Sequence, residues 1–339
     1  MTARSFRASR GAGVCALGVV LAGMLTAGCT QSVTPLWWHQ VPRQGDEIVA
    51  AGQLFHTGAP VVLWLDPKGY DAYNGHRHFD DTATMPSNPV SPNDPNRYGR
   101  RRKLSEDLAK RVAEEGWTLA NLQQQVDQFV IHYDVCGTSR QCFKVLHDVR
   151  GLSVHFMLDI DGTIYQTLDL KERAWHAGEA NDRSVGIEIA QIGAYPNMKV
   201  LDEWYKLDET GWPYISLPAW MTVTGVRTPN FVGRPARQHV VTGEINGRNL
   251  MQYDYTPEQY ASLVRLTAAL VRIFPNMRLD VPRNPDGSVR STALSREELE
   301  AWQGLLGHYH VTRGKSDPGP AFDWERLLRD TRRYLAWNL

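Results

Sequence analysis

Apolar residues recur at helical spacing in three stretches of the chain, and these stretches predict helices. Residues 104–126 repeat leucine and valine on one face, and Gly116 interrupts the repeat, so we expect two helices there. Residues 256–274 open with Thr-Pro-Glu, which is an N-cap followed by proline at the first helical position. Residues 323–335 place an apolar stripe opposite a charged face, as in a helix packed on a core.

Short continuous apolar runs between these helices predict buried strands. Runs at residues 60–65, 129–132 and 185–189 have the length of a strand. Residues 153–168 contain two such runs around an Asp-Gly pair, which is a strong signal for a hairpin turn. Strands and helices mixed in this order predict an α/β fold, with a mixed central β-sheet flanked by helices and a groove at the strand ends.

The composition is that of a folded globular protein. Of the 339 residues, 42% are apolar and 22% are charged. The 37 basic and 37 acidic residues balance, so no long-range field points to nucleic acid as a partner. We divide the chain into an export signal at 1–28, an extension at 29–105 and a main domain at 106–339, with insertions near 194–250 and 276–300. The extension is either packing material for the main domain or a small adaptor module.

The first residues have the pattern of an export signal. Arg4, Arg7 and Arg10 precede an apolar stretch at residues 11–26, which is too short for a comfortable transmembrane helix. Small residues then lead to Cys29, and this resembles the lipidation site of bacterial lipoproteins. We therefore expect an exported, periplasmic protein that is anchored to the outer membrane by a lipid on Cys29. An ordinary secretory signal with a chance cysteine is the alternative.

Two of the four cysteines lie in the main part of the chain. Cys136 and Cys142 are separated by only five residues. A close pair in an exported protein usually forms a disulfide, because the compartment is oxidising. Two free thiols are the alternative.

Histidines and acidic residues in the main domain suit hydrolytic metal chemistry. A catalytic zinc ion needs three protein ligands and an open position for water, and His132, His308 and Asp317 are candidate ligands. Glu188 is a lone acid in an apolar strand, where it could move a proton during amide hydrolysis. Lys315 could stabilise an oxyanion. Scattered ligands of this kind are a weak signal by themselves, and no His-Glu-x-x-His helix is present.

Five short stretches follow one another in a fixed order: FVIHYD from Phe129, SVHFMLDIDGTIYQ from Ser153, AWHAG from Ala174, SVGIEI from Ser184 and KSDPGPAFDW from Lys315. Together they resemble the zinc-dependent N-acetylmuramoyl-L-alanine amidase family, which is related to phage-lysozyme-type amidases and peptidoglycan-recognition proteins. The resemblance covers roughly residues 125–335 and leaves both insertions unmatched. It implies that fold, a Zn²⁺ cofactor, and hydrolysis of the amide between N-acetylmuramic acid and L-alanine in peptidoglycan or muropeptides.

The resemblance also implies roles for particular residues. His132, His308 and Asp317 match the zinc ligands of the family, Glu188 matches its catalytic acid and base, and Lys315 matches the lysine that polarises the substrate carbonyl. The Cys136–Cys142 pair resembles a short disulfide loop of peptidoglycan-recognition proteins.

Other residues near these motifs are weaker candidates. His310 lies two residues after His308 and is the alternative ligand. His176 and Asn181 are expected to contact the substrate, whereas His155 is expected to be structural. Several tryptophans could stack on sugars, although packing is the default expectation: Trp37, Trp38, Trp204, Trp212 and Trp220.

Two other functions stay open on the sequence alone. The first is a non-catalytic peptidoglycan-binding module on the same fold, which would typically lack a complete ligand set. The second is a glycosidase that uses paired carboxylates and leaves the sugar–peptide bond intact. Zinc content and the masses of the products would separate the three functions.

Overall fold

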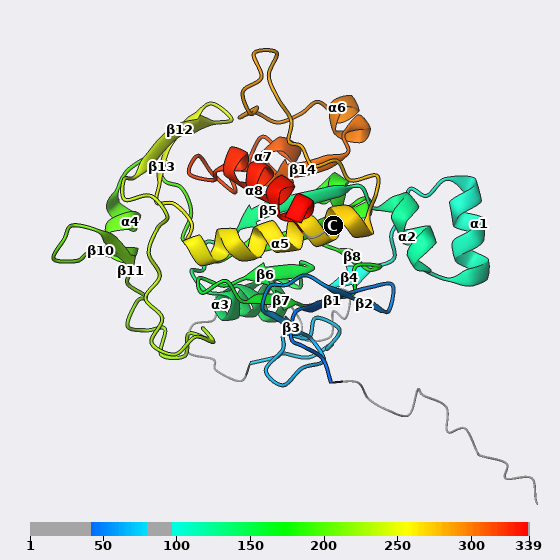
Figure 1. Cartoon of the computed structure of the whole chain (residues 1–339), viewed down its shortest axis with the longest axis horizontal. Coiled ribbons are helices and arrows are strands. Elements are labelled where there is room, and N and C mark those ends of the chain that lie inside the picture. Colours follow the sequence, from blue (N-terminus) through cyan, green and yellow to red (C-terminus); the bar gives the residue numbers. More distant parts are fainter. Residues whose placement is uncertain (1–41, 80–96, 338–339) are drawn as a thin grey trace, which may run out of the picture. The chain divides into compact units, whose positions relative to one another are not determined.

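The computed structural model describes residues 42–79 and 97–337 (Figure 1). The expected export signal and Cys29 lie outside the described residues. From Arg43 onward the chain forms one compact unit. None of its described helices combines the length and the apolar character that crossing a bilayer requires.

A mixed sheet of six strands lies at the centre of this unit, as the sequence predicted. Its strands follow in the order β14 (Gly304–Gly307), β5 (Gln128–Tyr133), β9 (Ser184–Ile189), β6 (Phe156–Leu158), β7 (Ile164–Gln166) and β3 (Val61–Leu63). The first four run parallel to one another. Strand β7 is antiparallel to β6, which confirms the predicted hairpin, and β3 runs parallel to β7.

Shorter elements surround the central sheet. Among the described residues, four strand pairs lie outside it: β1 (Glu47–Ala50) with β2 (Gln53–His56), β4 (Tyr98–Gly99) with β8 (Arg173–Ala174), β10 (Tyr205–Leu207) with β11 (Pro213–Ile215), and β12 (Val241–Ile245) with β13 (Arg248–Gln252). The described α-helices are α1 (Glu106–Glu115), α2 (Leu119–Gln125), α3 (Ser139–Phe143), α4 (Lys199–Trp204), α5 (Pro257–Ile273), α6 (Arg296–Ala301), α7 (His308–Val311) and α8 (Trp324–Trp337). A π-helix covers Lys144–Arg150 and a 3₁₀ helix covers Gly178–Asp182.

One face of the sheet is covered by α5 and α8, drawn yellow and red in Figure 1. The start of α5 is fixed as its sequence predicts, because Thr256 Oγ1 accepts from Gln259 N at 3.0 Å and Gln259 Oε1 accepts from Thr256 N at 2.9 Å. Apolar side chains from both helices, from α2 and from the strands form the main core. Burying this face fixes which side chains of each strand point to the other face.

Alternation along β5 and β9 sends their polar residues to the opposite face. Phe129 and Ile131 enter the main core, so His132 points away from α5. The same holds for Glu188, which lies between the core residues Ile187 and Ile189. The two strands pair in parallel with His132 opposite Glu188, so both side chains emerge side by side.

The segment before residue 105 belongs to the main unit. Strand β3 forms an edge of the central sheet, and Ile48 of β1 is buried in the main core. The side-chain amide of Gln166 accepts from Val49 N at 2.7 Å and donates to Val49 O at 2.8 Å, which ties β1 to β7. The described part of this segment therefore packs within the same compact unit as the main domain, and whether it has a further role stays open.

Candidate active site

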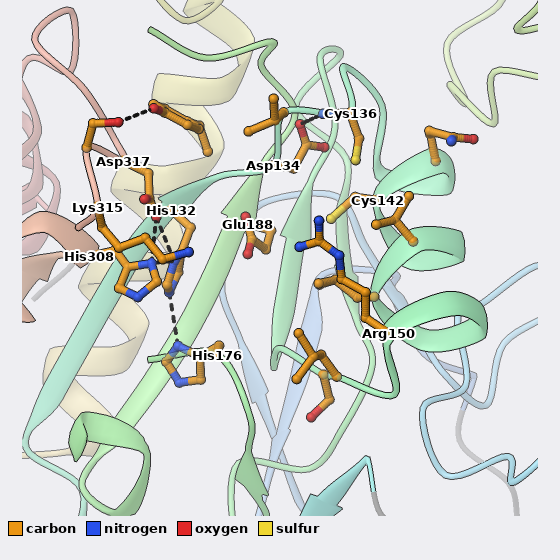
Figure 2. A pocket seen from close by; sticks show the side chains of 18 of the residues that line it. His132, Asp134, Cys136, Cys142, Arg150, His176, Glu188, His308, Lys315 and Asp317 are labelled. Carbon is orange, nitrogen blue, oxygen red and sulfur yellow. Dashed lines mark hydrogen bonds and ion pairs between the residues drawn. The ribbon is translucent and has the colours of Figure 1, made fainter. Parts of the chain in front are cut away.

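Three ligand atoms converge where β5, α7 and the loop before α8 meet. Nδ1 of His132 lies 3.0 Å from Nδ1 of His308, and each nitrogen lies 2.9 Å from Oδ2 of Asp317 (Figure 2). All three side chains are buried. Strand β5 delivers His132, whereas His308 follows directly after the neighbouring strand β14. Two adjacent parallel strands thus place two histidines at the same edge of the sheet.

The geometry of these atoms fits a zinc ion. Tetrahedral zinc with bonds of about 2.0–2.1 Å holds its ligand atoms roughly 3.3 Å apart, close to the 2.9–3.0 Å found here. Burial, together with the neighbouring His308, lowers the pKa of His132 to about 4, so the His132 ring is neutral at pH 7. Burial opposes ionisation of Asp317, but the two histidines hold the pKa of its carboxyl below the ordinary value. A neutral His132 imidazole beside the Asp317 carboxylate is the combination of ligand forms that zinc requires.

His310 is turned away from this group, which answers the question of the alternative ligand on geometric grounds. Its Nδ1 accepts from Gly307 N at 2.9 Å, and its Nε2 donates to Arg290 O at 2.7 Å. Both ring nitrogens are therefore used within the protein. The structure brings His308 to the cluster and makes His310 a buried link between two backbone segments.

Glu188 lies beside the cluster on the floor of a cleft (Figure 2). Its Oε2 is buried and has no hydrogen-bond partner. Burial raises the pKa of Glu188 well above its ordinary value, and the carboxyl groups of Asp317 and Asp134 raise it further. A carboxyl group with a raised pKa and a free oxygen is suited to exchange a proton with a bound molecule.

Lys315 lines the same cleft from the loop that carries Asp317, and its side chain is exposed. Contacts on several sides hold this loop in place. The Asn246 side-chain amide donates to Lys315 O at 3.0 Å and to Tyr309 O at 3.1 Å. Tyr255 donates through its hydroxyl to Pro318 O at 2.7 Å.

His176 is among the residues that line the cleft, and it also contacts His132; its predicted contact with the substrate stays a prediction. Its Nδ1 lies 3.0 Å from Nε2 of His132 and its Nε2 lies 3.2 Å from Oγ of Ser184. With Nδ1 of His132 directed at the ligand cluster, its Nε2–H donates to His176, whose own Nε2–H then donates to Ser184. This chain of hydrogen bonds fixes the tautomer and the orientation of His132.

Gly186 gives the ring of His176 its place on β9. A Cβ atom at this position would lie 2.5 Å from Cε1 and Nδ1 of His176 and 2.8 Å from its Cγ. The absence of a side chain at residue 186 therefore allows the His176 ring to lie on the strand that carries Glu188.

Comparison with known proteins places the chain in a family. Residues 122–320, more than half of the chain, match the family described as N-acetylmuramoyl-L-alanine amidase. The chain belongs to this family. No curated protein matches the chain.

Several solved amidase structures are similar to this amidase. The selenomethionine derivative of AmpD is 18% identical, with a TM-score of 0.32 over 69% of this chain and 90% of that one. AmiD from E. coli, solved with anhydro-N-acetylmuramic acid-L-Ala-D-gamma-Glu-L-Lys, is 18% identical, with a TM-score of 0.34 over 61% of this chain and 57% of that one. LysC from Clostridium intestinale is 15% identical, with a TM-score of 0.30 over 62% and 88% of the two chains.

Asn181 is not among the residues that line the cleft, so the structure gives no support to its predicted contact with substrate. Its side chain is buried, and Oδ1 accepts from His176 N at 3.2 Å and from Ala177 N at 2.7 Å. Asn181 holds the backbone of the loop that carries His176. A short polar side chain such as asparagine readily bonds to nearby backbone, and this competes with any role in binding.

The predicted disulfide is also absent, because Cys136 and Cys142 are free thiols in the structure. The two side chains are hydrogen-bonded to each other, and burial raises the pKa of the Cys142 thiol well above its ordinary value. Both line the cleft next to Glu188 (Figure 2). Their closeness in the sequence thus brings the sulfur atoms together without a covalent bond.

Three contributors to the site of this amidase went unrecognised in the sequence: Asn246, Gly186 and Ser184. Asn246 and Gly247 form the turn between β12 and β13. Asn-Gly between two strand-like runs is a strong hairpin signal, so the turn could have been found. The contacts of Asn246 with the Lys315 loop could not, since residues 246 and 315 are far apart in sequence.

His155 is structural as expected, with Nδ1 accepting from Gly186 N at 3.1 Å.

Proposed function

We propose that this amidase hydrolyses the bond between N-acetylmuramic acid and L-alanine in peptidoglycan or muropeptides, with a zinc ion held by His132, His308 and Asp317. The observation that supports it best is the convergence of three ligand atoms within 3.0 Å of one another, beside the unpartnered Oε2 of Glu188. Ligands and a proton-transfer group in one cleft are what metal-assisted amide hydrolysis requires.

Each residue of the cleft then has a definite task. When bound, zinc supplies a Lewis acid that polarises the carbonyl and lowers the pKa of water towards about 7. Glu188 takes a proton from the attacking water at its free Oε2 and gives it to the amine of the departing alanine. Lys315 reaches the cleft from the Asp317 loop, and its ammonium group stabilises the negative charge that develops on the carbonyl oxygen. His176 keeps His132 in the orientation that the ion requires.

Digestion of purified peptidoglycan tests this function. We expect release of peptides that begin with L-alanine, loss of the release after chelation, and its return with Zn²⁺, all followed by product masses. Zinc and sacculus binding without peptide release would instead support the non-catalytic binding module. Products that keep the sugar–peptide bond would support a glycosidase.

We also propose that the protein is exported and anchored to the outer membrane through a lipid on Cys29, on the basis of its N-terminal sequence alone. Mass spectrometry of the mature protein should find an acylated Cys29 as its first residue. A Cys29→Ala variant should be released into the soluble periplasmic fraction. A soluble native protein with an unmodified cysteine would refute the anchor.

A further inference from the structure

The insertion at 194–250 supplies one wall of the active-site cleft. The cleft has a volume of about 580 Å³, and two tryptophans of the insertion line it, Trp204 and Trp220. Trp204 is 9% exposed, whereas Trp220 is 50% exposed. Packing alone does not explain why a large apolar side chain such as Trp220 is half exposed in the active-site cleft.

Packing of the insertion does not account for Trp220. The insertion has its own apolar core, which includes Trp204, Leu201 and Tyr205, and Trp220 is not part of it. The residue that follows, Met221, enters this core and is 8% exposed. The buried Met221 therefore anchors the backbone next to residue 220, while the indole of Trp220 lines the cleft.

The wall is fixed tightly to the catalytic domain. Trp204 packs on Gly137, where an added Cβ would lie 2.3 Å from the indole ring. Thr138 Oγ1 donates to the sulfur of Met221 at 3.8 Å. Both contacts reach the loop that follows β5, the strand that carries His132. The position of Trp220 relative to the reacting groups is thus set by the fold.

We propose that Trp220 is a platform for a sugar ring of the substrate, placed by this insertion. The inference rests on the proposed function, since the bond to be cut joins a sugar to a peptide. Trp204 and Trp220 carry no charge, and an indole face matches the apolar C–H face of a pyranose. Stem peptides carry carboxylates, which suit Arg150, a cationic side chain elsewhere in the lining.

The test compares two substrates that share the scissile amide and the peptide. One is an N-acetylmuramoyl-L-alanyl peptide, and the other carries only a D-lactoyl group in place of the whole sugar. For the native protein we expect a higher kcat/KM on the sugar-bearing substrate. In Trp220→Ala this advantage should shrink by about five- to tenfold, with kcat/KM on the lactoyl peptide unchanged.

Matched variants make the result specific. Trp212 lies in the same insertion, is 36% exposed and is not among the residues that line the cleft, so Trp212→Ala should preserve the full advantage. Trp220→Phe keeps an aromatic face and should retain most of it. An equal loss on both substrates in Trp220→Ala, or no loss on either, would overturn the proposal.

Failure of the two proposals can be told apart. If the native protein cleaves neither substrate, the proposed function is wrong. If it cleaves both and Trp220→Ala leaves their ratio unchanged, the amidase activity stands and the sugar platform does not.

Discussion

Replacing Gly186 with alanine tests whether His176 orients His132, the proposed zinc ligand. The new Cβ would lie 2.5 Å from two atoms of the His176 ring, where ordinary contacts are 3.4–4 Å. Rotation cannot relieve the clash, because Cγ at the base of the ring is itself only 2.8 Å away. The whole ring must shift by about 1 Å, which takes its 3.0 Å hydrogen bond with His132 beyond the range of a hydrogen bond.

The expected effect on zinc follows from that lost bond. Removing the partner that orients a metal-bound histidine typically lowers metal affinity by about 10- to 100-fold. This corresponds to about 1.4 to 2.8 kcal/mol of binding free energy. At a fixed concentration of zinc, the variant should also unfold at a lower temperature, because the ion stabilises the folded state less.

Competition with a chromogenic chelator measures the zinc dissociation constant of each variant. Gly75→Ala is the matched control, since an added Cβ at Gly75 has open space around it. The decisive comparison adds Gly186→Ala to a His176→Ala background, where the clashing ring is gone. There the alanine should change zinc affinity little. If Gly186→Ala weakens zinc binding equally in both backgrounds, the reasoning about His176 is refuted.

Three further predictions follow from the site. Glu188→Gln should lower kcat by about 10²- to 10⁴-fold at unchanged zinc content, and an unchanged kcat would exclude Glu188 as the proton carrier. His308→Ala should lose zinc in metal analysis, whereas His310→Ala should keep zinc and lose about 1–3 kcal/mol of unfolding free energy in urea, because two buried hydrogen bonds disappear. Asn246→Ala should lower kcat by about ten- to a hundredfold, because it releases the Lys315 loop. The control is Asn230→Ala, since Asn230 is exposed and its left-handed φ of 56° is similar to the 50° of Asn246. Equal kinetics of the two asparagine variants would contradict that role.

The central sheet and its two main helices could be predicted because each depends on local pattern. Apolar runs gave the strands β5 and β9 and the Asp-Gly pair gave the β6–β7 turn, while Thr256 and Pro257 marked the start of α5. The family motifs also named the residues that the structure brings together, with His132 and Glu188 paired across two strands. Period-2 alternation explains this success, since it fixes the face to which each residue points.

Other features could not be predicted because they depend on contacts between distant segments. The motif of His176 predicted a residue of the groove, and His176 does line the cleft, but its contact with His132, 44 positions earlier, could not be predicted from the motif. The free thiols of Cys136 and Cys142 likewise depend on the local path of the chain, which spacing does not determine. Strand β14, which leads to His308, is only four residues long and half glycine, so its apolar signal is weak.

The insertion couples the cleft wall to the proposed zinc ligands. Its Asn246 fixes the backbone at Lys315, two residues before Asp317 in the same loop. Gln252, two residues past the insertion at the end of β13, donates to Pro318 O at 3.0 Å and accepts from Ala321 N at 2.9 Å, just after that ligand. At its other end Trp204 packs against the loop after His132. The segment that the family motifs leave unmatched therefore contacts the loops that carry Asp317 and follow His132. A displacement of the insertion would move one of these proposed ligands as well as the cleft wall.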